Sequence, residues 1–176
     1  MSTATRALLG VLCGMGILAL PSSTSSGFLE MQVLLRDNWT RPNLAVAPRT
    51  SAGPKVSVHV PCHAEPPEMV IATLDALSRL DYDDFEVIVV DNNTEDPRLW
   101  QPVAAHCEFL GERFRFYHVS PLTGAKAGAL NYALARADPG AELVALVDAD
   151  YQMTPDFLNE LVGHFDDPRL AYVQCR

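Results

Sequence analysis

Short apolar runs alternate with longer amphipathic segments from residue 55 to the end of the chain. Each run has the length of a strand. In the segments between the runs, apolar residues recur three or four positions apart, as they do on the buried face of a helix. This alternation is typical of βαβ units, which build a parallel sheet. It predicts four strands, at residues 56–60, 85–90, 113–119 and 142–147.

Four helices are predicted between and after these strands. The first begins at Pro66 and Pro67, because proline is well tolerated in a first helical turn, where its missing N–H is not needed. The last is introduced by Thr154 as N-cap and Pro155 as first helical residue. The apolar spacing places the four helices at residues 66–80, 102–110, 130–137 and 154–165.

Several of the strands are apolar at consecutive positions, as in the runs VIVV and LVALV. A strand with two apolar faces is expected where helices cover both sides of a sheet. The predicted fold class is therefore α/β, an open three-layer α/β/α sandwich with a mostly parallel sheet. In such sheets, ligands bind beyond the carboxyl ends of the strands.

The N-terminal part of the chain has a different pattern. Residues 7–20 form an uncharged apolar run of 14 residues preceded by Arg6. A helix needs ~20 residues to span a hydrocarbon core, so this run is a shortened or trimmed membrane helix, a signal peptide, or a peripheral or artefactual start. We expect a membrane segment at 1–20, a linker rich in Ser, Thr and Pro at 21–54, and a single domain at 55–176.

Charge and cysteine content narrow the possible functions. The chain has 22 Asp and Glu against 13 Lys and Arg, a formal charge of −9. Repulsion from phosphate backbones argues against a nucleic-acid partner, and an acidic domain that binds a nucleotide diphosphate needs a divalent cation. The four cysteines form no CxxC pair, so neither a disulfide framework nor a zinc cage is indicated, and a reducing cytoplasm fits best.

Polar groups follow three of the four predicted strands. PCHAEP follows the first, DNN the second and DADYQ the fourth. A single aspartate at such a position is commonly a turn or helix cap. Three polar groups at the same edge of a parallel sheet instead indicate one shared pocket.

Asp148, Ala149 and Asp150 form a D-x-D motif directly after the fourth strand. In extended backbone, residues i and i+2 project to the same side, so both carboxylates can face one ligand while Ala149 points away. Mg²⁺ or Mn²⁺ commonly pairs one or two carboxylates with substrate phosphates. The motif therefore predicts a site for a divalent metal and a diphosphate, where the metal would neutralise charge on a leaving group.

Gly124 and Gly128 flank Lys126 just before a predicted helix. The segment does not match the P-loop, because the lysine precedes the second glycine and no Ser or Thr follows. Glycines at a helix start still allow close approach of an anion, so Lys126 is a candidate phosphate contact; the alternative is a plain loop with a solvated lysine. His59 and His63 are assigned core or hydrogen-bonding roles, since no distant Cys/His pair completes a zinc set.

Four segments, in order, carry a resemblance to a known family: VSVHVPCHAEP, FEVIVVDNNTEDP, GAKAGALNYAL and LVALVDADYQMTPDFL. They closely resemble the donor-binding half of processive family 2 glycosyltransferases, a group that includes cellulose, hyaluronan and bacterial β-glucan synthases. The resemblance covers residues 54–176. It implies a GT-A (Rossmann-like) fold, a UDP-sugar donor, most often UDP-glucose, and transfer of a hexose with inversion to a growing polysaccharide.

The resemblance also implies roles for particular residues. The loop from Pro61 to Glu65 and Asp91 would hold the uracil and ribose. Lys126 and Gly128 would lie beside the nucleotide. Asp148 and Asp150 would bind the diphosphate through Mg²⁺ or Mn²⁺.

Two motifs that this family carries nearer its carboxyl end have no counterpart after the D-x-D motif of this sequence. They are the T-E-D motif, whose Asp is the general base, and the Q-x-x-R-W motif of the acceptor site. A base typically contributes ~10²–10⁴-fold to such a transfer. We therefore expect a domain truncated at its carboxyl end that binds a donor but transfers little, with its catalytic domain facing the cytoplasm at the membrane and a glycan as acceptor.

Two other classes remain open at this point. The chain could be a nucleotide-sugar-binding fragment without activity. It could also be a phosphatase of the haloacid dehalogenase type, whose nucleophile sits in a strand-end D-x-D. Against the phosphatase, Gln152 stands where Thr or Val is usual, and three βα units precede the motif.

Overall fold

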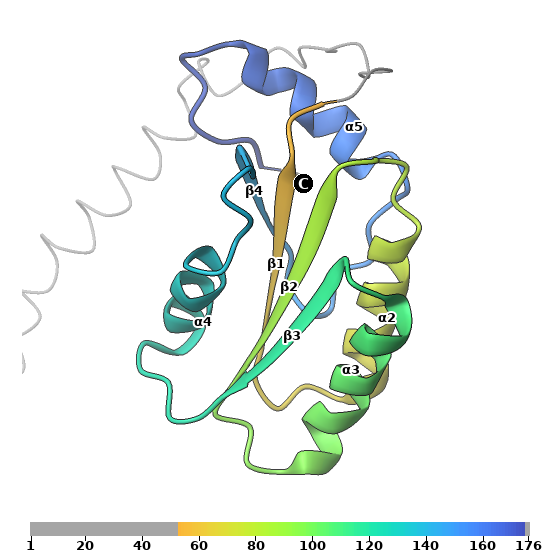
Figure 1. The fold of residues 1–176 in the computed structure, drawn as a ribbon, viewed down its shortest axis with the longest axis vertical. Coiled ribbons are helices and arrows are strands. Elements are labelled where there is room, and N and C mark those ends of the chain that lie inside the picture. Colours follow the sequence, from red (N-terminus) through yellow and green to blue (C-terminus); the bar gives the residue numbers. More distant parts are fainter. Residues whose placement is uncertain (1–52, 175–176) are drawn as a thin grey trace, which may run out of the picture. The chain divides into compact units, whose positions relative to one another are not determined.

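The computed structural model describes residues 53–174. Their centre is a four-stranded sheet in the order β3-β2-β1-β4, in which every neighbouring pair is parallel (Figure 1). The strands are β1 (Val56–Cys62), β2 (Phe85–Asn92), β3 (Phe114–Val119) and β4 (Leu143–Leu146). The helices are α2 (Pro67–Ser78), α3 (Pro97–Leu110), α4 (Ala125–Leu134) and α5 (Phe157–Val162), followed by the 3₁₀ helix η2 (Gly163–Asp166).

Helices cover both faces of the sheet. Alternate residues of β2 separate into two cores, as the pleat of a strand requires. Val87 and Val89 pack into a cluster with residues of α2, α3 and α5, whereas Ile88 and Val90 pack against Ala129 of α4 on the opposite face. Figure 1 shows α4 on one side of the sheet and α2 with α3 on the other. The predicted three-layer α/β/α fold is confirmed.

The strand ends differ from the prediction. β1 and β2 each continue two residues further, to Cys62 and Asn92. The reason is that the polar end of β2 is still paired with both neighbouring strands: Asp91 lies opposite Cys62 of β1 and opposite His118 of β3. An apolar pattern cannot detect a strand that continues through polar residues. β4 is shorter than predicted, since residues 142 and 147 lie outside it.

The helix boundaries also needed correction. α3 begins five residues before the predicted start, at Pro97, where Asp96 caps it by accepting the N–H of Arg98 (3.0 Å). α4 likewise begins at Ala125 rather than at 130. The predicted N-cap Thr154 was wrong, because α5 begins only at Phe157 and its N-cap is Asp156.

The predicted apolar segment 1–20 and nearly all of the predicted linker 21–54 lie outside the described residues. Between residues 53 and 174, no helix is both long and apolar enough to cross a membrane.

Candidate functional site

A cavity of about 640 Å³ lies at the carboxyl edge of the sheet. It is bordered by the segments that follow β1, β2 and β4 and by the first turn of α4. Five residues predicted to form the site line it: Pro61, Glu65, Lys126, Asp148 and Asp150. The rest of the lining is Cys62, His63, Met69, Asn92, Asn93, Ala125 and Ala149. The convergence expected from the strand-end positions is therefore present in the structure.

The D-x-D motif occupies a turn and not extended backbone. The N–H of Tyr151 donates to the carbonyl oxygen of Asp148 (3.1 Å), which closes the turn just after β4. Ala149 is 5% exposed and packs in the core, and its carbonyl oxygen accepts the hydroxyl of Thr73 (2.8 Å). Asp148 is half-buried and Asp150 is exposed at the cavity. The alternation argument was wrong in its geometry, because the motif forms a turn in which Ala149 borders the cavity and is at the same time buried in the core.

Lys126 extends from the first turn of α4 to the D-x-D turn. Its Nζ donates to Oδ1 of Asp148, so the segment between the glycines and the strand-end carboxylate are in direct contact. α4 is introduced by Gly124 at φ 90°, a left-handed conformation that glycine adopts without strain.

Gly128 does not line the cavity. A Cβ at this position would lie 2.0 Å from the carbonyl oxygen of Thr123, so the first turn of α4 packs closely on the preceding loop. The structure gives Gly128 a packing role at the helix start that carries Lys126, and its place beside a nucleotide stays a prediction.

The loop after β1 is tied to the end of β2. His63 Nδ1 donates to the carbonyl oxygen of Asn92 (2.6 Å), and the N–H of Ala64 donates to the hydroxyl of Thr94 (2.9 Å). Glu65 accepts the N–H of His63. These bonds place the Glu65 carboxylate at the cavity wall through backbone contacts.

Left-handed backbone is concentrated at this edge of the sheet. In residues 53–174, the non-glycine residues with positive φ are Ala64, Asn93 and Ala125, at 59°, 58° and 47°. One follows β1, one follows β2 and one opens α4. Such conformations persist only where the surrounding structure enforces them, and they are frequent at binding sites.

Asp91 does not line the cavity. It is 3% exposed, and its carboxylate accepts the hydroxyl of Thr94 (2.5 Å) and Nδ1–H of His118 (2.7 Å). The imidazole of His118 is in turn stacked on Trp100, with ring centroids 4.3 Å apart. In this arrangement the Asp91 carboxylate is bonded to Thr94 and His118 at the end of β2, and its contact with a nucleotide stays a prediction.

Sequence reasoning missed His118, Thr94 and Trp100. His118 is separated from Asp91 by 27 residues, and only the pairing of β2 with β3 places the two side by side. Thr94 offered a weak signal, because a threonine three residues after an aspartate can form a local hydrogen bond.

His59 and Cys62 have buried side chains at β1. His59 Nε2 lies 2.9 Å from Ser57 Oγ, and burial lowers the pKa of this imidazole. Burial also raises the pKa of the Cys62 thiol well above its ordinary value, so the sulfur at the cavity wall is not a thiolate nucleophile. His59 thus occupies the hydrogen-bonded core role that the sequence predicted.

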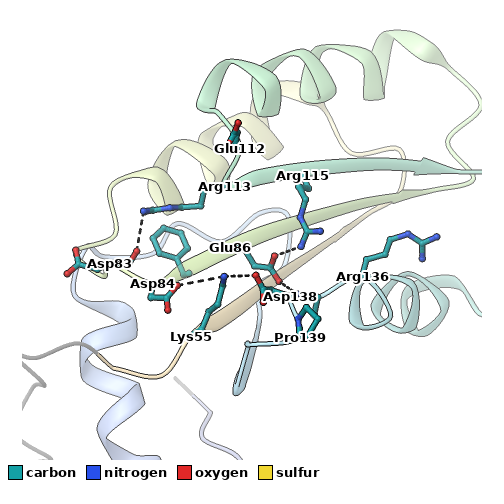
Figure 2. A pocket seen from close by; sticks show the side chains of 12 residues that line it. Lys55, Asp83, Asp84, Glu86, Glu112, Arg113, Arg115, Arg136, Asp138 and Pro139 are labelled. Atoms are coloured by element: carbon teal, nitrogen blue, oxygen red, sulfur yellow. Dashed lines mark hydrogen bonds and ion pairs between the residues drawn. The ribbon is translucent and has the colours of Figure 1, made fainter.

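A second cavity of about 510 Å³ lies at the opposite, amino edge of the sheet (Figure 2). Two ion pairs lie in its lining: Lys55 Nζ donates to Asp138 (2.6 Å), and Arg115 pairs with Glu86. Glu86 also accepts the hydroxyl of Ser57 and the N–H of Asp138, both at 2.7 Å. Because this network links β1, β2 and β3 to the chain after α4, we interpret it as structural.

No group of three or more His, Cys, Asp or Glu side chains in the described part of the chain could by itself hold a metal ion. Asp148 and Asp150 nonetheless provide hard oxygen atoms beside a cavity large enough for a ligand. Some magnesium and manganese sites complete their coordination with substrate phosphates and water. Such sites need only one or two carboxylates from the protein. The donor set therefore fits a divalent cation that binds together with a phosphorylated substrate.

The sheet is parallel and covered by helices on both faces, and carboxylates and a lysine border a cavity at the carboxyl ends of its strands. This arrangement defines the class of open α/β domains that bind ligands at that edge. The model of the family "Glycosyl transferase family 2" matches residues 57–176, and the chain belongs to this family. Because the chain belongs to this family, the alternative of a haloacid dehalogenase-type phosphatase was wrong.

Three known proteins illustrate the relationship. The chain is 35% identical over 130 residues to the probable glucomannan 4-beta-mannosyltransferase 6 of Oryza sativa subsp. japonica, covering 70% of this chain and 22% of that protein. It is 30% identical over 137 residues to an N-acetylglucosaminyltransferase of Sinorhizobium fredii, covering 75% and 32%. The chain thus spans between 22% and 32% of the length of these curated relatives.

Among solved structures, the mannosyltransferase PcManGT of Pyrobaculum calidifontis superposes with a TM-score of 0.63 at 29% identity. The match covers 86% of this chain and 43% of that enzyme, whose structure contains GDP-Man and Mn²⁺. The fold is that of the GT-A glycosyltransferases, as the sequence resemblance implied.

Proposed function

We propose that this chain is the donor-binding part of an inverting hexosyltransferase that acts on a nucleotide diphosphate sugar. The observation that carries the proposal is the meeting of Asp148, Asp150 and Lys126 at one cavity, in a chain of family 2. Two carboxylates and one ammonium group suit a ligand that brings a divalent cation and a diphosphate together.

In this proposal Asp148 and Asp150 hold Mg²⁺ or Mn²⁺. The metal, when bound, offsets the negative charge that develops on the nucleotide diphosphate as the glycosidic bond breaks. Lys126 and the N-terminal end of α4 provide positive charge on the other side of the phosphates. Mn²⁺ in the structure of the archaeal mannosyltransferase supports a divalent metal at this site.

The nucleoside would lie against the loop after β1. Pro61 and Glu65 border the cavity there, and Asn92 and Asn93 border it at the end of β2. Asp91 contributes by holding this edge through Thr94 and His118. We propose a UDP-hexose, with UDP-glucose first, as donor; the mannosyl and N-acetylglucosaminyl transfers named for the relatives make GDP-mannose and UDP-GlcNAc the donors to compare.

The same proposal includes the acceptor of the sugar and the cellular location of the protein. A growing polysaccharide as acceptor is supported by the glucomannan synthase among the relatives. A position at the cytoplasmic face of a membrane is supported by the apolar run at residues 7–20 and by the absence of a disulfide framework from the cysteine pattern.

Calorimetric titration of the chain with UDP-glucose in the presence of MnCl₂ tests the assignment. Asp150→Asn removes the exposed carboxylate charge at nearly constant volume, and we expect at least tenfold weaker binding, about 1.4 kcal/mol. Asp156→Asn makes the same change at an exposed position outside the cavity and should bind as the wild type does. Equal affinity of the Asp150→Asn variant and the wild type for every donor would disprove the metal and diphosphate site.

A further inference from the structure

The ion pair between Lys126 and Asp148 lies at the cavity and joins two separate segments of the chain. It joins the first turn of α4 to the turn after β4, 22 residues further along the chain, and both side chains line the cavity. The two side chains are 60% and 47% exposed, so packing does not hold them together. The pair therefore depends on charge, and a competing charge can displace either partner.

The two carboxylates of the motif are not equivalent. Oδ1 of Asp148 accepts from the ammonium group of Lys126, whereas Asp150 makes no ion pair or hydrogen bond with another described residue. An ammonium group beside Asp148 cancels the charge that would attract a divalent cation and repels that cation directly. Only Asp150 is available without displacement of another group.

We propose that Lys126 is a latch on the metal site. Before the donor arrives, it occupies Asp148 and disfavours binding of the metal alone. When a metal and a nucleotide diphosphate bind together, Asp148 turns to the metal and Lys126 to the phosphates. The affinity for the metal then depends on whether the nucleotide is bound, so the two ligands bind cooperatively at one site. This inference rests on the function proposed above.

The structure allows this exchange with little backbone change. The start of α4 is held by the close packing of Gly128 on the carbonyl of Thr123, so the Cα of Lys126 stays in place while its flexible side chain moves. Lys126 and Asp148 line the same cavity, in which the diphosphate would bind, so rotation about side-chain bonds suffices to change partners.

Lys126→Met tests the latch because it removes the charge and keeps an unbranched side chain. Binding of Mn²⁺ alone, followed by the electron paramagnetic resonance of free Mn²⁺, should become about tenfold tighter in this variant. Binding of UDP at saturating Mn²⁺, followed by calorimetry, should become about tenfold weaker. The changes have opposite signs, which a merely structural role of the lysine would not produce.

Arg79→Met is the matched control. It removes one positive charge at an exposed position outside the cavity, so it reports the effect of net charge alone. Unchanged or weaker Mn²⁺ binding in Lys126→Met would overturn the latch while leaving the proposed donor site intact. Failure of the wild type to bind UDP with Mn²⁺ would overturn both. Thermal unfolding of each variant verifies that it is folded.

Discussion

At the scale of single residues, the buried histidine of β1 gives the clearest consequence. His59 is 1% exposed, and burial, the largest cause, lowers the pKa of its imidazole in the folded chain below its ordinary value of 6.5. Below that pH the unfolded chain binds a proton that the folded chain excludes. The free energy of unfolding therefore falls as the pH decreases through and below 6.5, and this contribution is absent at higher pH.

The prediction compares urea unfolding at two pH values. Between pH 7.5 and pH 5.5 the wild type should lose about 1 kcal/mol more stability than a His59→Gln variant, since one proton accounts for at most about 1.4 kcal/mol per pH unit. An unchanged pH dependence in His59→Gln would show that other groups cause the loss.

Asp91 and Asp148 show at the same scale how an aspartate after a strand can have different roles. Both follow an apolar run, and the sequence assigned both to the ligand. Asp91 is 3% exposed and bonded to Thr94 and His118, whereas Asp148 borders the cavity. The difference arises because β2 is central and has neighbours on both sides, while β4 is the edge strand of the described sheet.

At the scale of elements, the start of α4 connects stability to binding. A methyl group at Gly128 would meet a backbone carbonyl at 2.0 Å, which cannot move without shifting the helix. We expect Gly128→Ala to lower the free energy of unfolding by about 1–3 kcal/mol, the usual cost of overpacking. It should also weaken donor binding severalfold by displacing Lys126.

Gly111→Ala separates the loss of stability from the loss of donor binding. Gly111 has a φ of 97° but open space around it, so alanine there is strained without a clash. Its ψ is −173°, and this combination of φ and ψ is essentially restricted to glycine. The variant should therefore lose about 1–3 kcal/mol of stability and keep the wild-type affinity for UDP. If both variants kept that affinity, the start of α4 would not position a ligand group.

At the scale of the whole molecule, the chain spans 43% of the archaeal mannosyltransferase that it resembles. No T-E-D sequence, and so no carboxylate in the position of the base, follows the D-x-D motif in the 176 residues. The tripeptide Thr94-Glu95-Asp96 lies before that motif, where Asp96 caps α3. We predict that the isolated chain binds UDP-glucose with Mn²⁺ but releases UDP about 10²–10⁴-fold more slowly than a family member that has its base.

A coupled assay for UDP, with a β-glucan oligosaccharide as acceptor, measures this turnover. The Asp150→Asn variant provides the background from uncatalysed hydrolysis. Sustained release above that background, at the rate of the longer enzymes, would show that another group of this chain removes the proton of the acceptor.

Much of the architecture could be predicted because it depends on local patterning. Runs such as VIVV have the length of a strand and two apolar faces, and parallel strands necessarily collect their carboxyl ends at one edge. The ends of the strands and the starts of the helices could not be predicted in this way. β2 continues through Asp91, and α3 begins at a capped proline, so neither boundary is marked by an apolar period.

The sequence alone determined that Asp148, Asp150, Lys126 and the loop after β1 would meet at one edge of a three-layer sheet. The strand positions are encoded in the local apolar pattern, and parallel strands share one carboxyl edge. Only the tertiary structure decided how those groups are used. It closed the D-x-D motif into a turn, paired Lys126 with Asp148 and buried Asp91 against His118. Each of these depends on contacts between elements 22 or more residues apart or on the course of the backbone after a strand, and neither follows from hydrophobic periodicity.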